Sequence, residues 1–155
     1  MRSNELSDTL IINERKINSI PIIKSKIESH LHAWLARTSS TDNVITFKTI
    51  NILVGPGYMD TNPVLLRVYK EGKIIIDKAG SSLRISWAVK LDTLYFIALC
   101  FSTLIFIITY SYCNIELIYA LSIGLAFFLM LVFMGILLIK YKLDDMIYSC
   151  VYPNY

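Results

Sequence analysis

Two long apolar runs in the C-terminal half constrain this chain more than any other feature. The first extends from Thr93 to Tyr112 over 20 residues, and the second from Ile115 to Ile139 over 25. The only charged residue in this region is Glu116, in the short joint between the runs. An α-helix needs about 20 apolar residues to cross the ~30 Å hydrocarbon core of a bilayer. The pattern therefore predicts a transmembrane hairpin of two helices, with the lipid bilayer as its first partner.

The charge balance changes where the apolar runs begin. Residues 1–90 carry 13 basic and 8 acidic residues, a net charge of +5, whereas the rest of the chain carries 2 basic and 4 acidic residues, a net charge of −2. We therefore divide the chain into a small domain at residues 1–90, a hairpin at 91–142 and a tail at 143–155. A mildly basic domain held at a membrane is expected to face anionic headgroups. Because no run of five Lys or Arg residues occurs, direct nucleic-acid binding is not expected.

The basic residues that flank the hairpin predict its orientation. Lys90 stands just before the first run, and Lys140 and Lys142 follow the second, whereas the joint has no basic residue. The positive-inside rule then places the N-terminus, the C-terminus and the tail in the cytoplasm, with the hairpin tip outside a bacterial inner membrane. In a mitochondrial membrane, the same rule would place both termini in the matrix.

A helix is predicted near the N-terminus by apolar residues that recur on one helical face. We expect it from Ile22 to Arg37, with Pro21 suited to its first turn, followed by a polar loop at Thr38–Asn43. This face could pack on a sheet as part of a core, or it could dip into lipid headgroups as an interfacial helix. We favour the core because strand-like segments follow it. The apolar residues of this face are Ile23, Ile27, Leu31, Trp34 and Leu35.

The rest of the N-terminal domain shows the composition of β-strands. Segments rich in β-branched residues, bounded by turn residues, predict antiparallel strands, and Glu71-Gly72 would join two of them as a hairpin. The fold class expected is a small cytoplasmic α+β domain of one amphipathic helix and three or four antiparallel strands, followed by the transmembrane hairpin. The candidate strands are Val44–Val54, Val64–Tyr69, Lys73–Asp77 and Leu83–Trp87, with a further short strand at Thr9–Ile12.

No group of residues in the sequence indicates catalysis. His30 and His32 are two residues apart, so on a helix they point in nearly opposite directions and cannot share a metal ion. The Gly-Pro-Gly at 55–57 is typical of a turn and lacks the spacing of a phosphate-binding loop. The three cysteines show no spacing of a metal site. We expect no enzyme activity, no cofactor and no metal.

Hydroxyl groups form a stripe along the first apolar run. Tyr95, Ser102 and Thr109 are seven residues apart and therefore share one helical face, and Thr103 lies beside them. Polar groups are costly where they face lipid hydrocarbon. The stripe could line a water-filled lumen between several copies of the chain, or it could pack on the second helix or on a partner protein. We favour packing.

Small residues predict a contact surface on the second run. Ala120 and Gly124 are four residues apart, a spacing that lets two membrane helices approach closely. Neither run contains an acidic or basic side chain at bilayer depth, because Asp92 and Glu116 lie at the ends of the runs. This argues against a proton relay or an ion-coupled transporter. Two spans are also too few to form a transporter alone. Any passage through the membrane would have to form between copies, in a homo-oligomer.

The layout of the whole chain, a small cytoplasmic domain before a two-helix hairpin, resembles the two-transmembrane effectors of bacterial anti-phage systems. These include effectors of retrons and of cyclic-nucleotide signalling operons. The resemblance implies an effector that a cytoplasmic inhibitor or sensor protein holds inactive through residues 1–90, and that disrupts the inner membrane when released. It carries over no individual residue role.

A different class of function is equally compatible with the sequence. The chain could be a non-catalytic structural or assembly subunit of a larger membrane complex, with its soluble domain docked on a neighbouring subunit. A receptor-like anchor for a cytoplasmic protein is a third alternative.

Overall fold

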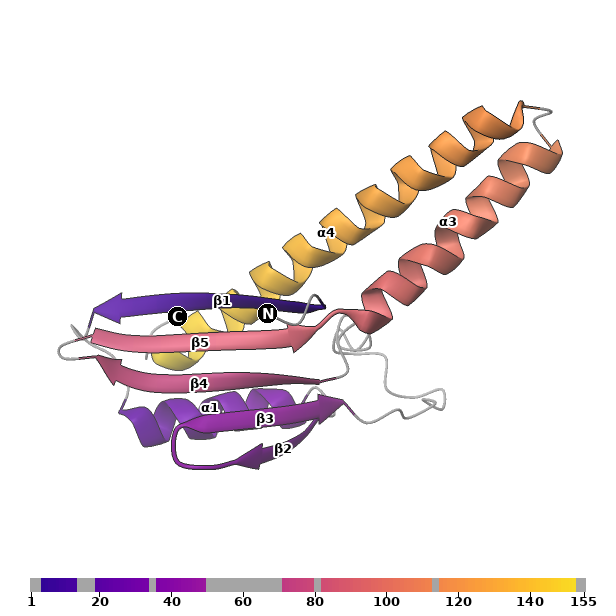
Figure 1. Ribbon diagram of the computed structural model, residues 1–155. Coiled ribbons are helices and arrows are strands. Elements are labelled where there is room, and N and C mark those ends of the chain that lie inside the picture. The colour runs from indigo at the N-terminus through magenta and orange to yellow at the C-terminus, as the bar shows by residue number, and fades with distance from the viewer. Residues whose placement is uncertain are drawn as a thin grey trace.

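A computed structural model of the chain shows a small antiparallel sheet followed by two long apolar helices (Figure 1). The structure describes residues 4–13, 19–33, 36–49, 71–79, 82–112 and 115–152. The elements in chain order are β1 (Glu5–Asn13), α1 (Ile20–Ala33), β2 (Ala36–Ser40), β3 (Val44–Thr49), β4 (Glu71–Ala79), β5 (Ser82–Lys90), α3 (Asp92–Tyr112) and α4 (Leu117–Val151).

Among the described residues, five strands pair in the order β1-β5-β4-β3-β2, and every pair is antiparallel. The last strand of the chain, β5, therefore pairs with the first, β1. β5 shows how the sequence produces two different faces: Leu83 and Ile85 are buried, whereas Arg84, which lies between them in the sequence, is exposed on the other side. This alternation is the period of two that a strand imposes.

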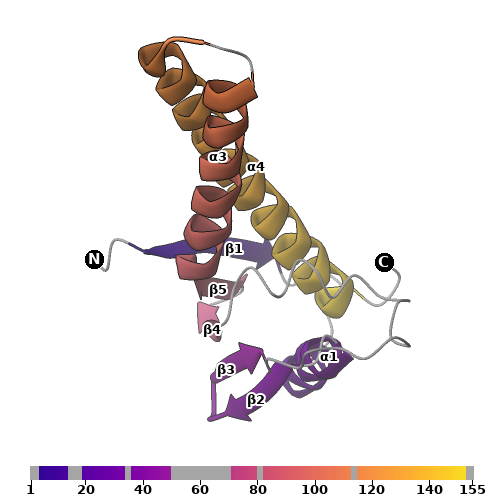
Figure 2. The same ribbon diagram turned by 90° about the vertical axis from the view of Figure 1, so that its right-hand side faces the viewer.

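Helix α1 and the last turns of α4 lie together on the apolar face of the sheet (Figure 2). The opposite face carries no helix among the described elements. The prediction that α1 is a core helix is confirmed, because Ile23, Ile27 and Leu31 are fully buried. Trp34 and Leu35 lie outside the described residues.

The predicted C-terminal end of this helix was wrong. The structure ends α1 at Ala33, and the segment predicted to be the end of the helix and a loop forms β2 instead. β2 pairs with β3 around a turn in which the Thr41 N–H donates to the Val44 carbonyl at 2.9 Å. Apolar residues continue past the end of α1, so helical periodicity alone could not find the boundary.

The strand predictions were partly confirmed. The segments Thr9–Ile12, Lys73–Asp77 and Leu83–Trp87 are strands, and each is longer than predicted. Glu71 and Gly72 lie within β4, so the prediction that they join two strands was wrong. The candidate strand Val64–Tyr69 lies outside the described residues. The sheet has five described strands rather than three or four because β1 and β2 pair at its two edges.

Helix α4 continues well past the second apolar run. Its last turns place Leu143, Ile147 and Cys150, each fully buried, in the core beside α1 and the sheet. The segment after Lys142 that we expected to be a tail is therefore, as far as Val151, part of the folded domain. The apolar residues Leu143, Ile147 and Cys150 of this segment recur every three or four positions, which gives one buried helical face.

Candidate functional site: an apolar hairpin fixed to the sheet domain

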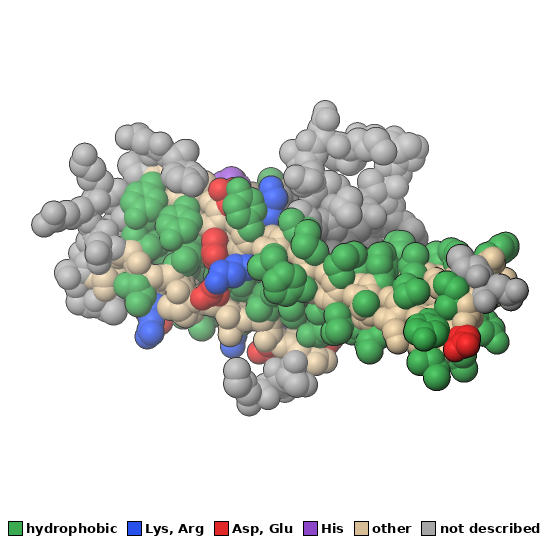
Figure 3. All heavy atoms as spheres, turned by 90° about the horizontal axis from the view of Figure 1, so that it is seen from above, with side chains coloured by type: hydrophobic (Ala, Val, Ile, Leu, Met, Phe, Trp, Pro, Cys, Tyr) green, Lys and Arg blue, Asp and Glu red, His purple; other side chains and the backbone are tan. Residues whose placement is uncertain are grey.

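The outer surface of the hairpin is almost entirely apolar. α3 and α4 are long and apolar enough to cross a membrane, and only 22% and 11% of their most apolar windows are buried. A core helix of a globular protein would instead be mostly covered. Figure 3 shows hydrophobic side chains gathered along the length of the hairpin. Exposed apolar surface of this extent marks an interaction with a membrane or a protein.

The two helices touch through small side chains. Ala98 and Ser102 of α3 and Ala120 and Gly124 of α4 are buried at their contact. A Cβ atom added to Gly124 would lie 3.2 Å from Cβ of Phe106, tighter than ordinary contact. The small residues therefore serve the packing of the hairpin itself, as small residues do between closely spaced membrane helices.

The hydroxyl groups of the predicted stripe bond to their own helix. Ser102 Oγ donates to the Leu99 carbonyl at 3.0 Å, and Thr103 Oγ1 donates to the same carbonyl at 2.8 Å. Thr109 Oγ1 donates to the Ile105 carbonyl at 2.7 Å. Ser102 is only 7% exposed and faces α4. Tyr95 is half-buried and packs against the core of the sheet domain. The residues of the predicted stripe therefore lie in different environments: Ser102 faces α4, and Tyr95 packs on the sheet domain.

Sequence reasoning missed a polar cluster at the base of the hairpin, where α4 enters the sheet domain. Asp8 of β1 lies opposite Trp87 of β5, and both contact α4. The indole Nε1 of Trp87 donates to Asp144 Oδ1 at 3.0 Å, and Lys140 Nζ lies 2.6 Å from Asp8 Oδ2. Lys140 and Asp144 are one helical turn apart, so the two contacts together hold one side of α4 against the two strands.

The electrostatics of this base cluster differ between its two carboxylates. The hydrogen bond from Lys140 lowers the pKa of Asp8 below its ordinary value. Burial raises the pKa of Asp144, although the Trp87 hydrogen bond acts in the opposite direction. The ion pair with Lys140 thus stabilises the charged form of Asp8. Asp144 instead accepts a hydrogen bond from the buried N–H group of Trp87.

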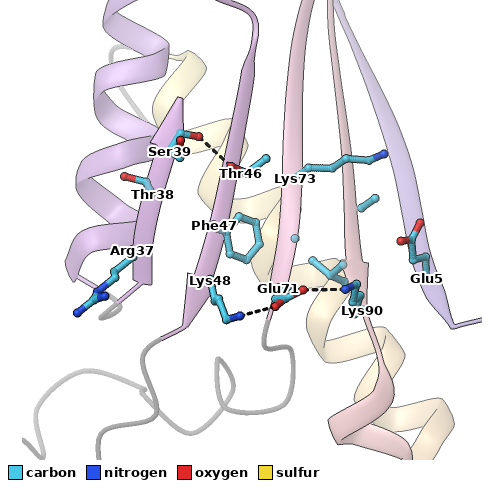
Figure 4. Close-up of a pocket in the computed structure, with 13 residues that line it drawn as sticks. Glu5, Arg37, Thr38, Ser39, Thr46, Phe47, Lys48, Glu71, Lys73 and Lys90 are labelled. Atoms are coloured by element: carbon cyan, nitrogen blue, oxygen red, sulfur yellow. Dashed lines mark hydrogen bonds and ion pairs between the residues drawn. The ribbon is translucent and has the colours of Figure 1, made fainter. Parts of the chain in front are cut away.

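A second polar region lies at the end of the sheet from which α3 leaves. Lys48, Glu71 and Lys90 form a chain of ion pairs there, with Nζ–carboxylate distances of 2.8 Å and 2.7 Å (Figure 4). They border a cavity of about 440 Å³. The hydrogen bonds from the two lysines lower the pKa of Glu71 to about 2.

The remaining candidate ligands form no site in the described part of the chain. His30 is exposed, and His32 Nε2 lies 3.0 Å from the hydroxyl of Thr38. No group of three potential metal ligands occurs among the described residues. Cys100 is exposed on α3, whereas Cys150 is buried, and burial raises its pKa. The turn at 55–57 lies outside the described residues.

The chain matches no family model, no curated protein and no solved structure.

Proposed function

We propose that α3 and α4 cross a membrane and that the sheet domain lies on the side of their charged base. Lys90, Lys140 and Lys142 are at this base, and the joint at the other end of the hairpin carries only Glu116. By the positive-inside rule, the base faces the cytoplasm. The chain would then be an integral protein of the bacterial inner membrane with both termini in the cytoplasm.

The function we propose for this arrangement is an effector that disrupts the membrane under the control of a cytoplasmic protein. The observation that carries the proposal is the continuity of α4, which is one helix from the hairpin joint to the core of the sheet domain. The base cluster holds this helix to β1 and β5. A partner that binds the sheet domain and shifts these strands would therefore move the hairpin directly.

Disruption would require several copies. A single hairpin encloses no path, because its two helices pack directly on each other through small side chains. Its outer surface is apolar over most of its length, so copies could pack side by side in the bilayer. Release from the inhibitory or sensor partner would allow this assembly and so permeabilise the membrane.

The proposal is tested by producing the full chain alone in a bacterium while following growth and propidium uptake. We expect rapid permeabilisation, because no partner is present to hold the protein inactive. Gly124→Leu, which wedges the two helices apart, should abolish propidium uptake at an equal level in the membrane. Ala126→Leu, on an exposed position of the same helix, should leave it unchanged. Harmless accumulation of the unmodified chain in the membrane would contradict the effector function.

A structural or assembly subunit is the second candidate, and the hydroxyl groups of α3 favour it. Ser102 is buried within the hairpin, and Thr103 and Thr109 donate to their own helix. A hairpin whose polar groups are satisfied internally suits a stable anchor. This candidate predicts that the chain is harmless alone and purifies with a stoichiometric membrane partner.

The lumen hypothesis has its own test. Thr103→Val with Thr109→Val removes two hydroxyl groups and keeps the shape of the side chains, without disturbing the buried Ser102. If these hydroxyl groups line a water-filled path, the double variant should permeabilise cells much less than the unmodified chain. Undiminished propidium uptake would remove the lumen and leave disruption by apolar packing.

A further inference from the structure

One row of charged side chains crosses all five described strands on the open face of the sheet. The row follows from the register, because each of its members lies opposite the next on the adjacent strand. It stands at the end of the sheet where β5 leads into α3 (Figure 1). In order across the sheet, its members are Glu5, Lys90, Glu71, Lys48 and Arg37.

The signs alternate along this row except at one end. Glu71 is paired with a lysine on each side, at 2.7 Å and 2.8 Å. Beyond them, Arg37 lies directly opposite Lys48, which places two positive charges side by side. Like charges directly opposite each other on a sheet are unfavourable. Figure 4 shows the guanidinium of Arg37 pointing away from Lys48, as expected for two cations with no anion between them.

The cavity of about 440 Å³ lies along this row and extends over the next one. There it is lined by Lys73 and by the hydroxyl-bearing Ser39 and Thr46 (Figure 4), and by Ala88, which lies opposite Lys73 on the adjacent strand. The lining contains four basic and two acidic residues. Arg37 and Lys73 make no ion pair with any described residue. The cavity therefore has an excess of positive charge that the described fold leaves unneutralised.

We propose that this cavity binds the phosphate group of an organic anion. Arg37 lies at the rim of the cavity, and its exposed side chain would have to turn inward to offer its planar pair of donors to phosphate oxygens. Lys73 and Lys48 add positive charge. Ser39 supplies a further hydroxyl donor from β2. The volume lies within the ~300–1,000 Å³ range of small-molecule sites. The phosphate could belong to an anionic lipid, because the cavity lies where the chain enters α3, or to a soluble phosphate ester. The site does not depend on the proposed effector activity.

The test is calorimetric titration of the full-length protein in neutral detergent micelles. One arm uses dihexanoyl phosphatidylglycerol as a soluble anionic lipid, with dihexanoyl phosphatidylcholine as the uncharged comparison, and the other arm uses inorganic pyrophosphate. Binding of the phosphatidylglycerol alone identifies a lipid headgroup, and binding of pyrophosphate identifies a soluble phosphate source. We expect Arg37→Gln with Lys73→Gln to weaken whichever binding occurs by at least about tenfold, because the double variant removes two charged hydrogen-bond donors from the cavity.

The matched control is Lys78→Gln with Arg84→Gln, which removes the same charge from the opposite end of β4 and β5. This control should bind as the unmodified protein does. Circular dichroism shows whether each variant is folded, and Arg37→Gln alone, at an exposed position, replaces the double variant if that one is not. Absence of binding by both anionic probes, or equal weakening by the control pair, would overturn the site.

Discussion

At the residue scale, Trp87 and Asp144 connect the sheet to the helix that leaves it. Trp87 is 1% exposed, so its indole N–H has no access to water and depends on Asp144 as its acceptor. A buried donor that loses its partner costs more than the bond itself contributes. Burial raises the pKa of Asp144 because it disfavours the charged form. Asp144 therefore stabilises the fold through its acceptor oxygen rather than through its charge.

This distinction gives a prediction for two substitutions at one position. Asp144→Ala leaves the Trp87 N–H without an acceptor and should lower the free energy of unfolding by about 1–3 kcal/mol. Asp144→Asn keeps an acceptor oxygen and removes the charge whose burial is unfavourable at neutral pH, so its loss should be clearly smaller. Thermal unfolding in neutral detergent micelles measures both. Equal losses for the two variants would show that the charge, not the hydrogen bond, matters.

Glu71 gives a prediction about pH. Its pKa falls from 4.5 to about 2 because Lys48 and Lys90 hydrogen-bond its charged form. A lowered carboxyl pKa stabilises the folded state above the unfolded value, and this contribution is lost as pH falls through the folded value. The melting temperature of Glu71→Gln should therefore lie below that of the unmodified protein at pH 7. The difference should shrink between pH 4.5 and about 2, whereas a constant difference would contradict the ion-pair account.

At the element scale, the hairpin is held together by small side chains and the end of α4 by large ones. Ala98, Ala120 and Gly124 let α3 and α4 approach closely, whereas Leu143 and Ile147 fill the space between α1 and the sheet. α4 thus changes from an outward-facing apolar helix to an inward-facing one near Ile139, its first fully covered residue after Gly124. Each half should respond differently to a change in side-chain volume.

In the hairpin half, added volume should be harmful only on the face toward α3. Gly124→Leu is expected to lower the free energy of unfolding by about 1–3 kcal/mol, because the new side chain meets Phe106 and the Ser102 backbone. Ala126→Leu places the same side chain on an exposed position and should change it little. Melting in neutral detergent micelles compares them. A similar loss for both variants would contradict the observed packing of α3 on α4.

In the domain half, removed volume should be harmful. Leu143 is fully buried in the core, so Leu143→Ala should cost about 2–5 kcal/mol. Asp145→Ala, two residues further along at an exposed position, should change stability by less than about 0.5 kcal/mol. Chemical unfolding in micelles, followed by the fluorescence of the buried Trp87, measures both. A Leu143→Ala variant as stable as the control would mean that residues after 142 are a tail after all.

The elements differ in how far the sequence could predict them. The core face of α1 and the strand Leu83–Trp87 follow from local periodicity, and both were predicted. β2 was missed because its short polar sequence, Ala36–Ser40, becomes a strand only through pairing with β3. The buried face at Leu143, Met146, Ile147 and Cys150 has a readable helical spacing, but its length and its position behind a membrane span suggested a tail. The base cluster depends on β1 lying beside β5, a long-range pairing that no local pattern predicts.

At the scale of the whole molecule, two parts with opposite surfaces share one helix. The sheet domain has a buried apolar face and a polar open face, whereas the hairpin exposes its apolar side chains. Because α4 belongs to both, the hairpin cannot turn relative to the sheet without breaking the base cluster or uncovering the core. The control that we propose for a partner on the sheet domain depends on this rigidity, and it requires that the hairpin be in a membrane.

Membrane insertion is therefore the central claim, and thiol labelling tests it most directly. Cys150 is unsuitable as an internal reporter, because it is fully buried and its pKa is raised. The informative pair is Cys113, in the joint of the hairpin, and Ser25→Cys, at an exposed position of α1 in a chain with Cys113→Ser. Both chains carry Cys100→Ala.

A membrane-impermeant maleimide is applied to spheroplasts that still exclude propidium. The account predicts that Cys113 is labelled in intact spheroplasts, and that the cysteine at position 25 is labelled only after the membrane has been opened. Labelling of position 25 with protection of Cys113 would reverse the orientation. Labelling of neither cysteine until the membrane has been opened would show that the hairpin does not cross the membrane.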